Sequence, residues 1–561
     1  MELKKEKTKF LHLIRRSTII AIYLLIITFL IKIAPNYIKE ADDNRINLMV
    51  NNNNVTKNLK NDIIIKDNEY YLSAGDVKNF FDEFLYEDKN YIILTSNTKT
   101  AKYVKNSNKI DINTSEVDVT NPSIDVNNTT FLPMSELASI YNLEYKYDQN
   151  TNKLMVDSLS KKFVEAKSKS NQSIRYKADF FSKSIARIKK GETVSIVQDF
   201  NSNEDTELNG WVRVRTSSGI IGYVKKSSIK DRIVVRDNLT REKINGKVSI
   251  MWDYYSPYDP CPTRTDKIQG VNAVSPSFFE LMSNGDIKTN IGDSGKKYVT
   301  WAKNNGYKVW PTLSNTFLNN KDAVSKMMST FETREYLIEN IVNSLIDADV
   351  DGINIDLENM YKEDKDKYSR FIIELAPRIR DLGMTLCVDV TEPDGSDTWS
   401  LCYDRHTLAE TADYLVFIGY DQHNNSSKEA GTVAGYDWEE KNIKKFLGPQ
   451  EGISSDKLIL AMPFYTRLWR ESNGKITSKV VNMKDVKIPS NVKVTWDDTT
   501  KQNYYEYEEN GTTYKMWIED ETSISNKLNL VNQYNLAGAG FWEKDREKDG
   551  VWSIVKEKLQ N

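Results

Sequence analysis

The segment from Asp351 to Glu358, Asp-Gly-Ile-Asn-Ile-Asp-Leu-Glu, carries acidic side chains at a spacing that suits acid–base chemistry. Its polar side chains at positions 354, 356 and 358 alternate with apolar ones at 353, 355 and 357. This period of two predicts a strand with one polar and one apolar face, so Asp356 and Glu358 should be neighbours. Carboxylates on a buried strand are costly unless they are used, paired or hydrated. The pattern indicates either a catalytic pair or a structural acidic cluster.

The elements around this strand predict a parallel sheet of the α/β class. Apolar residues recur at helical spacing over 337–346 before it and over 371–379 after it. From residue 247 onward, eight strand candidates alternate with helical segments: Val248–Tyr254, Ala273–Phe278, Lys308–Leu313, Gly352–Glu358, Thr385–Val390, Tyr414–Gly419, Leu458–Pro463 and Gly538–Trp542. Eight such strands predict a (β/α)8 TIM barrel, in which chemistry lies at the C-terminal strand ends. Glu358 falls at such an end.

The spacing of Asp351, Asn354, Asp356 and Glu358 resembles the Asp-x-x-Asp-x-Asp-x-Glu signature of glycoside hydrolase family 18, the chitinase-like family. Asn354 stands where the family usually has Asp, a variant that resembles the branch acting on bacterial cell-wall and spore-cortex glycan. The resemblance covers the barrel region. Later motifs agree in order: Ile418-Gly419-Tyr420-Asp421 resembles a sixth-strand motif, Met462-Pro463-Phe464-Tyr465 with Arg467 a seventh-strand motif, and Trp542 an eighth-strand Trp.

The resemblance implies a substrate-assisted mechanism that retains the anomeric configuration. It makes Glu358 the proton donor and later the base for water, while the 2-acetamido oxygen of the substrate acts as nucleophile. It implies that Asp356 orients the acetamido group, that Tyr420 hydrogen-bonds its oxygen, and that Trp542 packs under the sugar. We also expect substrate contacts from the remaining candidate residues, Asn354, Asp421, Trp310 and Tyr465.

Elementary electrostatics supports these roles. Close carboxylates should raise the pKa of one of them, which would keep Glu358 protonated near neutral pH, as a general acid requires. Asn354 cannot ionise and is expected to hydrogen-bond Asp356. Asp351, at the start of the strand, is expected to be structural.

We therefore expect a β-N-acetylglucosaminidase acting on peptidoglycan or spore cortex, in germination or in growth. A chitinase-type hydrolase of other GlcNAc polymers is an alternative within the enzymes. A non-catalytic glycan-binding surface protein is the alternative outside them. Relatives that became lectins typically lose the acid, however, and Glu358 is present.

The first 60 residues predict export. Basic side chains before position 17 precede an apolar run from Thr18 to Ile31. No small-x-small cleavage site follows, so we expect residues 1–35 to be a cytoplasmic tail and signal-anchor, with a cleaved signal as the alternative. Residues 36–60, rich in Asn, Asp and Lys, are expected to be a linker.

Two small domains are expected before the barrel. Residues 61–158 contain a short internal repeat, because Tyr70–Ser73 and Phe131–Ser135 each precede a helix-like segment. They resemble the α+β domain near the start of copper amine oxidases, without copper chemistry because the segment lacks histidine. Residues 170–230, with Trp211 and Tyr223 in a Gly-Trp…Gly-Tyr-Val pattern, resemble a bacterial SH3 domain. Within the barrel domain, 244–561, a hairpin signal at Asn510-Gly511 predicts an α+β insertion over 475–520.

Composition excludes several other classes. With 77 Lys+Arg and 80 Asp+Glu the net charge is −3, which gives no electrostatic case for nucleic acid. Three cysteines do not make a disulfide framework, although Cys387 and Cys402 could pair. Three histidines without zinc-ligand spacing give no case for a metal. We expect no cofactor, a monomer, a location at the bacterial cell surface, and GlcNAc-containing glycan and the membrane as partners.

Overall fold

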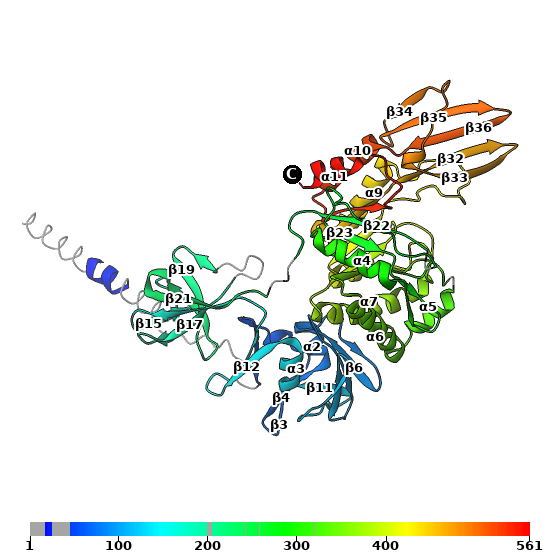
Figure 1. The fold of residues 1–561 in the computed structure, drawn as a ribbon. Coiled ribbons are helices and arrows are strands. Elements are labelled where there is room, and N and C mark those ends of the chain that lie inside the picture. The colour runs from blue at the N-terminus through cyan, green and yellow to red at the C-terminus, as the bar shows by residue number, and fades with distance from the viewer. Residues whose placement is uncertain are drawn as a thin grey trace, which may run out of the picture. The chain divides into compact units, whose positions relative to one another are not determined.

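A computed structural model describes residues 17–24, 45–198, 205–239, 241, 243–256, 258–318 and 320–560. The chain divides into two compact units, one ending at Thr240 and one formed mainly by Arg241–Asn561 (Figure 1). Residues 17–24 are helical. Among the described residues, no helix has the length and apolar character needed to cross a membrane. The remainder of the predicted signal-anchor, 1–16 and 25–35, lies outside the described residues.

The second unit contains a closed ring of parallel strands. In ring order its staves are β22 (Val248–Asp253), β23 (Ala273–Pro276) with β24 (Phe279–Leu281), β26 (Lys308–Val309) with β27 (Thr312–Ser314), β28 (Gly352–Asp356), β29 (Thr385–Val390), β30 (Tyr414–Ile418), β31 (Leu458–Pro463) and β37 (Gly538–Trp542). The ring closes because β22 pairs in parallel with both β23 and β37. The TIM-barrel prediction is confirmed.

Two staves are interrupted where a single strand was expected. The third stave breaks at Trp310-Pro311, between β26 and β27. Proline has no backbone N–H, so it cannot continue the hydrogen-bonded ladder at that point. The second stave breaks after Pro276, and β24 then forms a hairpin with β25 (Ile287–Thr289).

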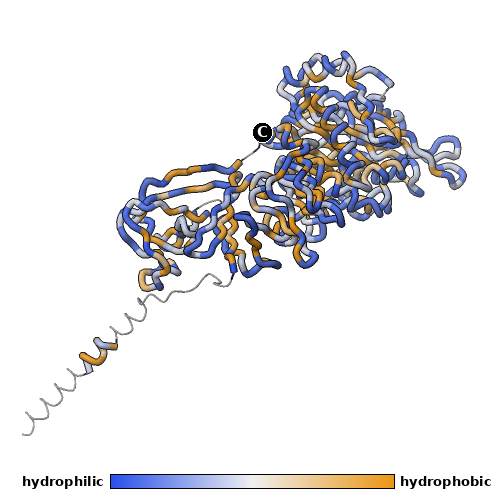
Figure 2. The backbone as a smooth tube through the Cα atoms, turned by 90° about the horizontal axis from the view of Figure 1, so that it is seen from below, coloured by the Kyte–Doolittle hydropathy of each residue, from blue (hydrophilic) through white to orange (hydrophobic). Residues whose placement is uncertain are grey.

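Helices follow the strands and cover the ring. Their bounds are α4 (Gly292–Asn304), α5 (Lys321–Met327), α6 (Phe331–Ala348), α7 (Lys365–Asp381), α8 (Arg405–Thr411), α9 (Tyr436–Leu447), α10 (Glu521–Gln533) and α11 (Val551–Leu559). One core layer lies between strands and helices and contains Ile353, Ile355 and Leu357. A second fills the ring and contains Ile250, Trp252 and Val416. Figure 2 shows apolar stretches inside this unit and polar ones at its rim.

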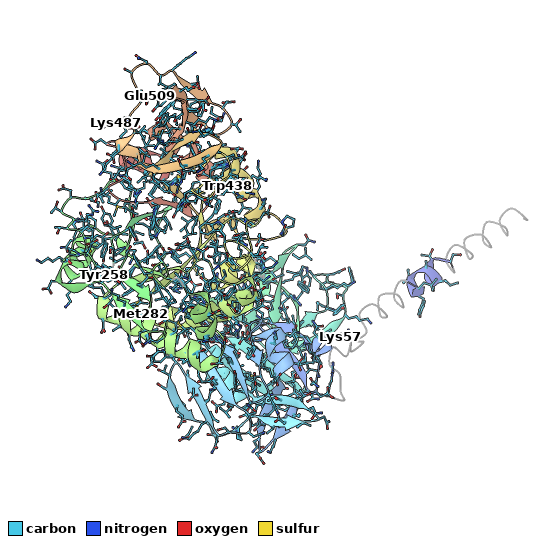
Figure 3. All side chains as sticks on the ribbon, turned by 90° about the vertical axis from the view of Figure 1, so that its right-hand side faces the viewer. Lys57, Tyr258, Met282, Trp438, Lys487 and Glu509 are labelled. Atoms are coloured by element: carbon cyan, nitrogen blue, oxygen red, sulfur yellow. The ribbon has the colours of Figure 1, made fainter. Side chains whose placement is uncertain are left out.

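The insertion after the seventh stave is a separate antiparallel sheet. It consists of β32 (Tyr465–Ser472), β33 (Lys475–Asn482), β34 (Val494–Asp497), β35 (Gln502–Glu509) and β36 (Thr512–Ile518), in the order β33-β32-β36-β35-β34. The hairpin at Asn510-Gly511 is confirmed, with both residues at positive φ. The insertion starts earlier than predicted, and over 465–518 it holds strands and one 3-10 turn but no α-helix. Lys487 and Glu509, both in the insertion, are labelled in Figure 3.

The first unit begins with an α+β domain. Strand β4 (Glu69–Ser73) leads into α2 (Ala74–Phe80), and β11 (Thr129–Pro133) leads into α3 (Met134–Tyr141), with β4 and β11 paired antiparallel. Strand β1 (Asn47–Val50) pairs in parallel with β13 (Lys153–Ser158). The linker prediction is therefore wrong from residue 45 onward, because this Asn-rich stretch supplies a buried strand. The other strands are β2 (Asn53–Asn54), β3 (Ile64–Lys66), β5 (Tyr86–Glu87), β6 (Tyr91–Thr95), β7 (Thr100–Val104), β8 (Lys109–Ile112), β9 (Ser115–Asp118), β10 (Ile124–Val126) and β12 (Leu143–Asp148).

A small antiparallel barrel-like sheet follows. Its strands are β14 (Phe163–Ser168), β15 (Gln172–Arg175), β16 (Ser184–Ile188), β17 (Thr193–Ile196), β18 (Glu207–Leu208), β19 (Trp211–Arg215), β20 (Ile221–Lys225) and β21 (Ile229–Arg236). Val164, Val194 and Val212 are among its buried core residues. Trp211 and Tyr223 are only half-buried and lie outside that core.

In the barrel unit, Cys261, Cys387 and Cys402 are buried free thiols, so the possible disulfide is not formed.

Candidate active site

The acidic strand places its polar side chains inside the barrel mouth. Ile353, Ile355 and Leu357 are buried in the layer between strands and helices, so the alternating side chains face the interior. Asp356 ends β28 and Glu358 follows two residues later, and both are half-buried. This is the neighbouring pair expected from the sequence.

The loop after the third stave holds the backbone of Glu358. The Nδ2 of Asn315 donates to the Glu358 carbonyl at 2.9 Å, and the Glu358 N–H donates to Asn315 Oδ1 at 3.0 Å. The Tyr403 hydroxyl donates to the carbonyl of Leu357 at 2.9 Å. These contacts fix the position from which the Glu358 side chain extends. Sequence reasoning missed Asn315, whose signal is an amide directly after a barrel strand.

The electrostatics of the pair favours protonated acids. Burial and the charge of Glu280 raise the pKa of Asp356 to about 7. Burial, Asp356 and Asp421 raise the pKa of Glu358 well above its usual range. Glu280 is held by the Ser314 hydroxyl at 2.5 Å and by the Phe317 N–H at 2.6 Å. An acid that retains its proton near neutral pH is what general acid catalysis needs.

The hydrogen bonds of the Asn354 side chain differ from the prediction. Its Nδ2 donates to Asp389 Oδ1 at 2.6 Å, and its Oδ1 accepts from Trp252 Nε1 at 2.8 Å. The expected hydrogen bond to Asp356 is not formed, because the amide already serves these two partners. Asn354 is fully buried, so the predicted substrate contact is also unsupported. Asp389 was missed; its signal is an acid within the apolar strand β29.

Aromatic side chains gather near the carboxylates. Tyr420 stacks on Trp542 with ring centroids 6.4 Å apart, and it meets Tyr465 edge-on at 6.2 Å. The Tyr465 hydroxyl donates to Asp421 Oδ1 at 2.6 Å. Burial, Tyr465 and the carboxylates Asp356, Asp389 and Glu358 raise the pKa of Tyr420 well above normal, so its phenol remains a proton donor. Tyr420, Asp421, Tyr465 and Trp542 therefore lie together.

Trp310 does not join this group. Its side chain is 1% exposed and stacks on Tyr414, with ring centroids 5.9 Å apart. A Cβ added at Gly352 would lie 2.6 Å from the Trp310 indole. Tyr414 and Gly352 are the first residues of β30 and β28, so Trp310 fills the barrel near the strand starts. The predicted substrate contact is wrong, because the stave continues past Pro311 to Ser314. Asp351 is structural as expected, accepting from the Val309 N–H at 3.0 Å.

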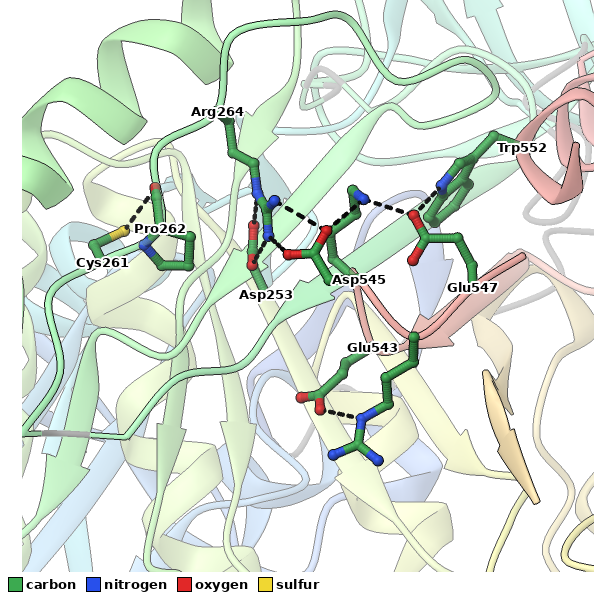
Figure 4. A network of polar contacts seen from close by, with 10 residues as sticks. Asp253, Cys261, Pro262, Arg264, Glu543, Asp545, Glu547 and Trp552 are labelled. Atoms are coloured by element: carbon green, nitrogen blue, oxygen red, sulfur yellow. Dashed lines mark hydrogen bonds and ion pairs between the residues drawn. The ribbon is translucent and has the colours of Figure 1, made fainter. Parts of the chain in front are cut away.

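An ion-pair network ties the first stave to the segment after Trp542 (Figure 4). Arg264 binds Asp253 through two hydrogen bonds of 2.9 and 2.7 Å, and it binds Asp545 through two of 3.2 and 2.7 Å. Although burial raises the pKa of Asp545, the bonds to Arg264 and Lys544 lower it to about 2. Such bidentate pairs hold the loop geometry beside the site.

No group of His, Cys, Asp or Glu suited to a metal ion occurs in the part of the chain described here.

A TIM barrel with an acid pair, a tyrosine and a tryptophan at its mouth defines a glycosidase-like class of site. Residues 249–547, more than half of the chain, match the family model of glycosyl hydrolases family 18, and residues 171–230 match the bacterial SH3 domain. The chain therefore belongs to glycosyl hydrolase family 18 and carries a bacterial SH3 domain.

The chain is similar to several known proteins over the barrel region. The chain is 25% identical over 297 residues to the uncharacterized glycosylase YvbX of Bacillus subtilis, covering 51% of this chain and 84% of that protein. It is 22% identical over 326 residues to the cortical fragment-lytic enzyme of Bacillus cereus, covering 53% and 71%. It is also similar to the crystal structure of a chitinase from Chromobacterium violaceum, with a TM-score of 0.47, 20% identity, and coverage of 56% and 98%.

Proposed function

We propose that this protein hydrolyses β-linked, N-acetylglucosamine-containing glycan of the bacterial cell wall, either peptidoglycan or spore cortex. The observation that carries the proposal is the pair Asp356 and Glu358, both with raised pKa values, beside Tyr420 and Trp542. This arrangement supplies a protonated acid, a second carboxyl group, a phenol donor and an aromatic surface in one barrel mouth.

The proposed mechanism assigns one step to each group. The Glu358 carboxylic acid gives its proton to the glycosidic oxygen while the C1–O bond breaks, and the 2-acetamido oxygen forms a bond to C1. The resulting oxazolinium carries the positive charge beside Asp356, which accepts the acetamido N–H. Tyr420 donates to the acetamido oxygen, and Trp542 packs against the sugar. Water then attacks C1 while the bond between C1 and the acetamido oxygen breaks, which restores the 2-acetamido group. The Glu358 carboxylate takes a proton from this water, so the β configuration is retained.

Three observations favour wall glycan over other GlcNAc polymers. The SH3 domain and the basic and apolar N-terminal sequence suit a protein that is exported and acts at the wall. The relative from Bacillus cereus is named a cortical fragment-lytic enzyme. Asn354 in the signature also resembles that branch. Action outside the cytoplasmic membrane is part of the proposal.

The test uses purified vegetative and spore sacculi, with chitin oligomers as the competing substrate. We expect soluble fragments with GlcNAc at the new reducing end, identified by mass spectrometry, and none from the Glu358→Gln variant. Faster turnover of chitin oligomers would favour the chitinase alternative. Efficient hydrolysis of cellulose or starch fragments, which lack the 2-acetamido group, would rule out substrate assistance. Cleavage of none of these glycans would leave the lectin-like alternative.

A further inference from the structure

A third carboxyl group lies beside the acid pair on the neighbouring strand. Strands β28 and β29 run parallel, with Ile355 paired to Val388, so continuing the register pairs Asp356 with Asp389. Paired residues of a parallel ladder point to the same face, and Asp389 is only 4% exposed. Its charge is among those that raise the pKa of Tyr420. Asp389 therefore shares the interior site.

The hydrogen bond from Asn354 engages one of the two carboxylate oxygens of Asp389. Trp252 Nε1 can only donate, and it donates to Asn354 Oδ1 at 2.8 Å. The amide therefore cannot flip, and its Nδ2 faces Asp389 Oδ1 at 2.6 Å. This leaves Asp389 Oδ2 outside the amide contact. Asp356 Oδ1 is buried and has no hydrogen-bond partner among the described residues.

The groups around Asp389 cannot all be charged together. Asp356 and Glu358 from β28 both raise its pKa, after burial, whereas the Asn354 hydrogen bond lowers it. The remaining titratable neighbours are the thiol Cys387 and the phenols Tyr368 and Tyr420. None of these can supply a positive charge. Adjacent buried carboxylates in such a site are stabilised when they share one proton.

We propose that Asp389 is the proton-sharing partner of Asp356, so that the pair is formed across two strands instead of along one. This inference rests on the proposed function. In the resting site one proton joins the two carboxyl groups. As positive charge develops on the oxazolinium, the proton on Asp356 passes to Asp389 Oδ2, which leaves Asp356 as a carboxylate against the acetamido N–H. One O–H bond breaks and one forms. Asp389 acts through Asp356 and is a positioning residue.

The test uses two variants, one that removes the carboxyl group from β29 and one that also introduces a carboxyl group on β28. Asp389→Asn removes the proton acceptor at constant shape, and Asn354→Asp/Asp389→Asn returns an acid to the same buried site from β28. We expect Asp389→Asn to lower kcat about 10- to 100-fold with little change in KM. Loss of a like charge should also lower the pKa of Asp356 and move its limb of the pH profile to lower pH. The double exchange should recover most of kcat.

A titration separates this inference from the proposed function. The carboxyl carbons of Asp356 and Asp389 can be followed by NMR against pH without any substrate. In the wild type we expect the two carboxyl groups to titrate in two coupled steps. In Asp389→Asn we expect Asp356 to titrate in a single step at lower pH. Independent single steps in the wild type would overturn the inference even if the glycan is cleaved. An inactive wild type with coupled steps would overturn the proposed function alone. The wild-type titration also decides the matter should Asp389→Asn not fold.

Discussion

Asn315 and Glu358 are joined by two hydrogen bonds between a side-chain amide and a peptide backbone, at 2.9 and 3.0 Å. Asn315 follows the third stave, and Glu358 follows the fourth. The amide holds both the N–H and the carbonyl of the residue that carries the proposed acid. A displacement of about 1 Å at a reacting group costs catalysis heavily, so Asn315 should matter without touching the substrate.

Asn315→Ala should therefore reduce both stability and turnover. Loss of two part-buried hydrogen bonds is expected to lower the free energy of unfolding by about 1–3 kcal/mol. We expect kcat to fall about tenfold as the acid loses its fixed position. Chemical denaturation and steady-state kinetics measure the two effects. The control is Asn340→Ala on α6, which removes one hydrogen bond from the side-chain amide to the Gly285 carbonyl and should leave kcat unchanged. Equal kcat in both variants would contradict the role of Asn315.

Glu358→Gln should abolish turnover while the fold is retained. The amide keeps the shape of the side chain but has no acidic proton to give, so kcat should fall by about 10²- to 10⁴-fold. Turnover of purified sacculi and circular dichroism are the measurements. Glu363→Gln, five residues further along the chain in a 3-10 turn, serves as the control for a lost carboxylate. A Glu358→Gln variant with near wild-type turnover would remove Glu358 from the mechanism.

The strands and the acid pair were predictable because their signals are local. The alternation over 353–357 places Asp356 and Glu358 on one face wherever the strand packs. The contacts of Asn315 and Asp389 were not predictable, because they depend on the register between staves 35 to 43 residues apart in sequence. Trp310 was misplaced for a related reason, since its depth in the barrel depends on packing against Tyr414 and Gly352 of other strands. Strand β1 was missed because the Asn, Asp and Lys residues around it favour a linker, whereas its short apolar run, 48–50, becomes a strand by pairing with β13.

The raised pKa of Glu358 also predicts a pH-dependent effect on stability. A carboxyl group whose pKa is raised on folding holds its proton more tightly in the folded state. The contribution of such a group to the free energy of unfolding is fully present below the pKa that the group has in the unfolded chain. This contribution is lost as pH rises through the pKa that the group has in the folded protein. Each pKa unit is worth about 1.4 kcal/mol. Glu358→Gln should therefore raise Tm relative to the wild type more at pH 8 than at pH 5, by roughly 2–4 °C for each kcal/mol. A larger gain at pH 5 would show that Glu358 is ionised without penalty.

Glu280 offers a way to shift the pKa of Asp356 without altering Asp356 itself. Its charge is the next cause, after burial, of the value of about 7, and Glu280 lies in register with Ser314, which is paired to Asp356. Glu280→Gln removes the negative charge, so the pKa of Asp356 should fall and the matching limb of the kcat/KM profile should move to lower pH by roughly 0.5 unit or more. Asp349→Asn, at the exposed C-terminus of α6 with φ 52°, changes the net charge equally and should leave the limb in place. Equal shifts in the two variants would mean that the profile responds to net charge, and an unchanged limb in Glu280→Gln would separate Glu280 from the site.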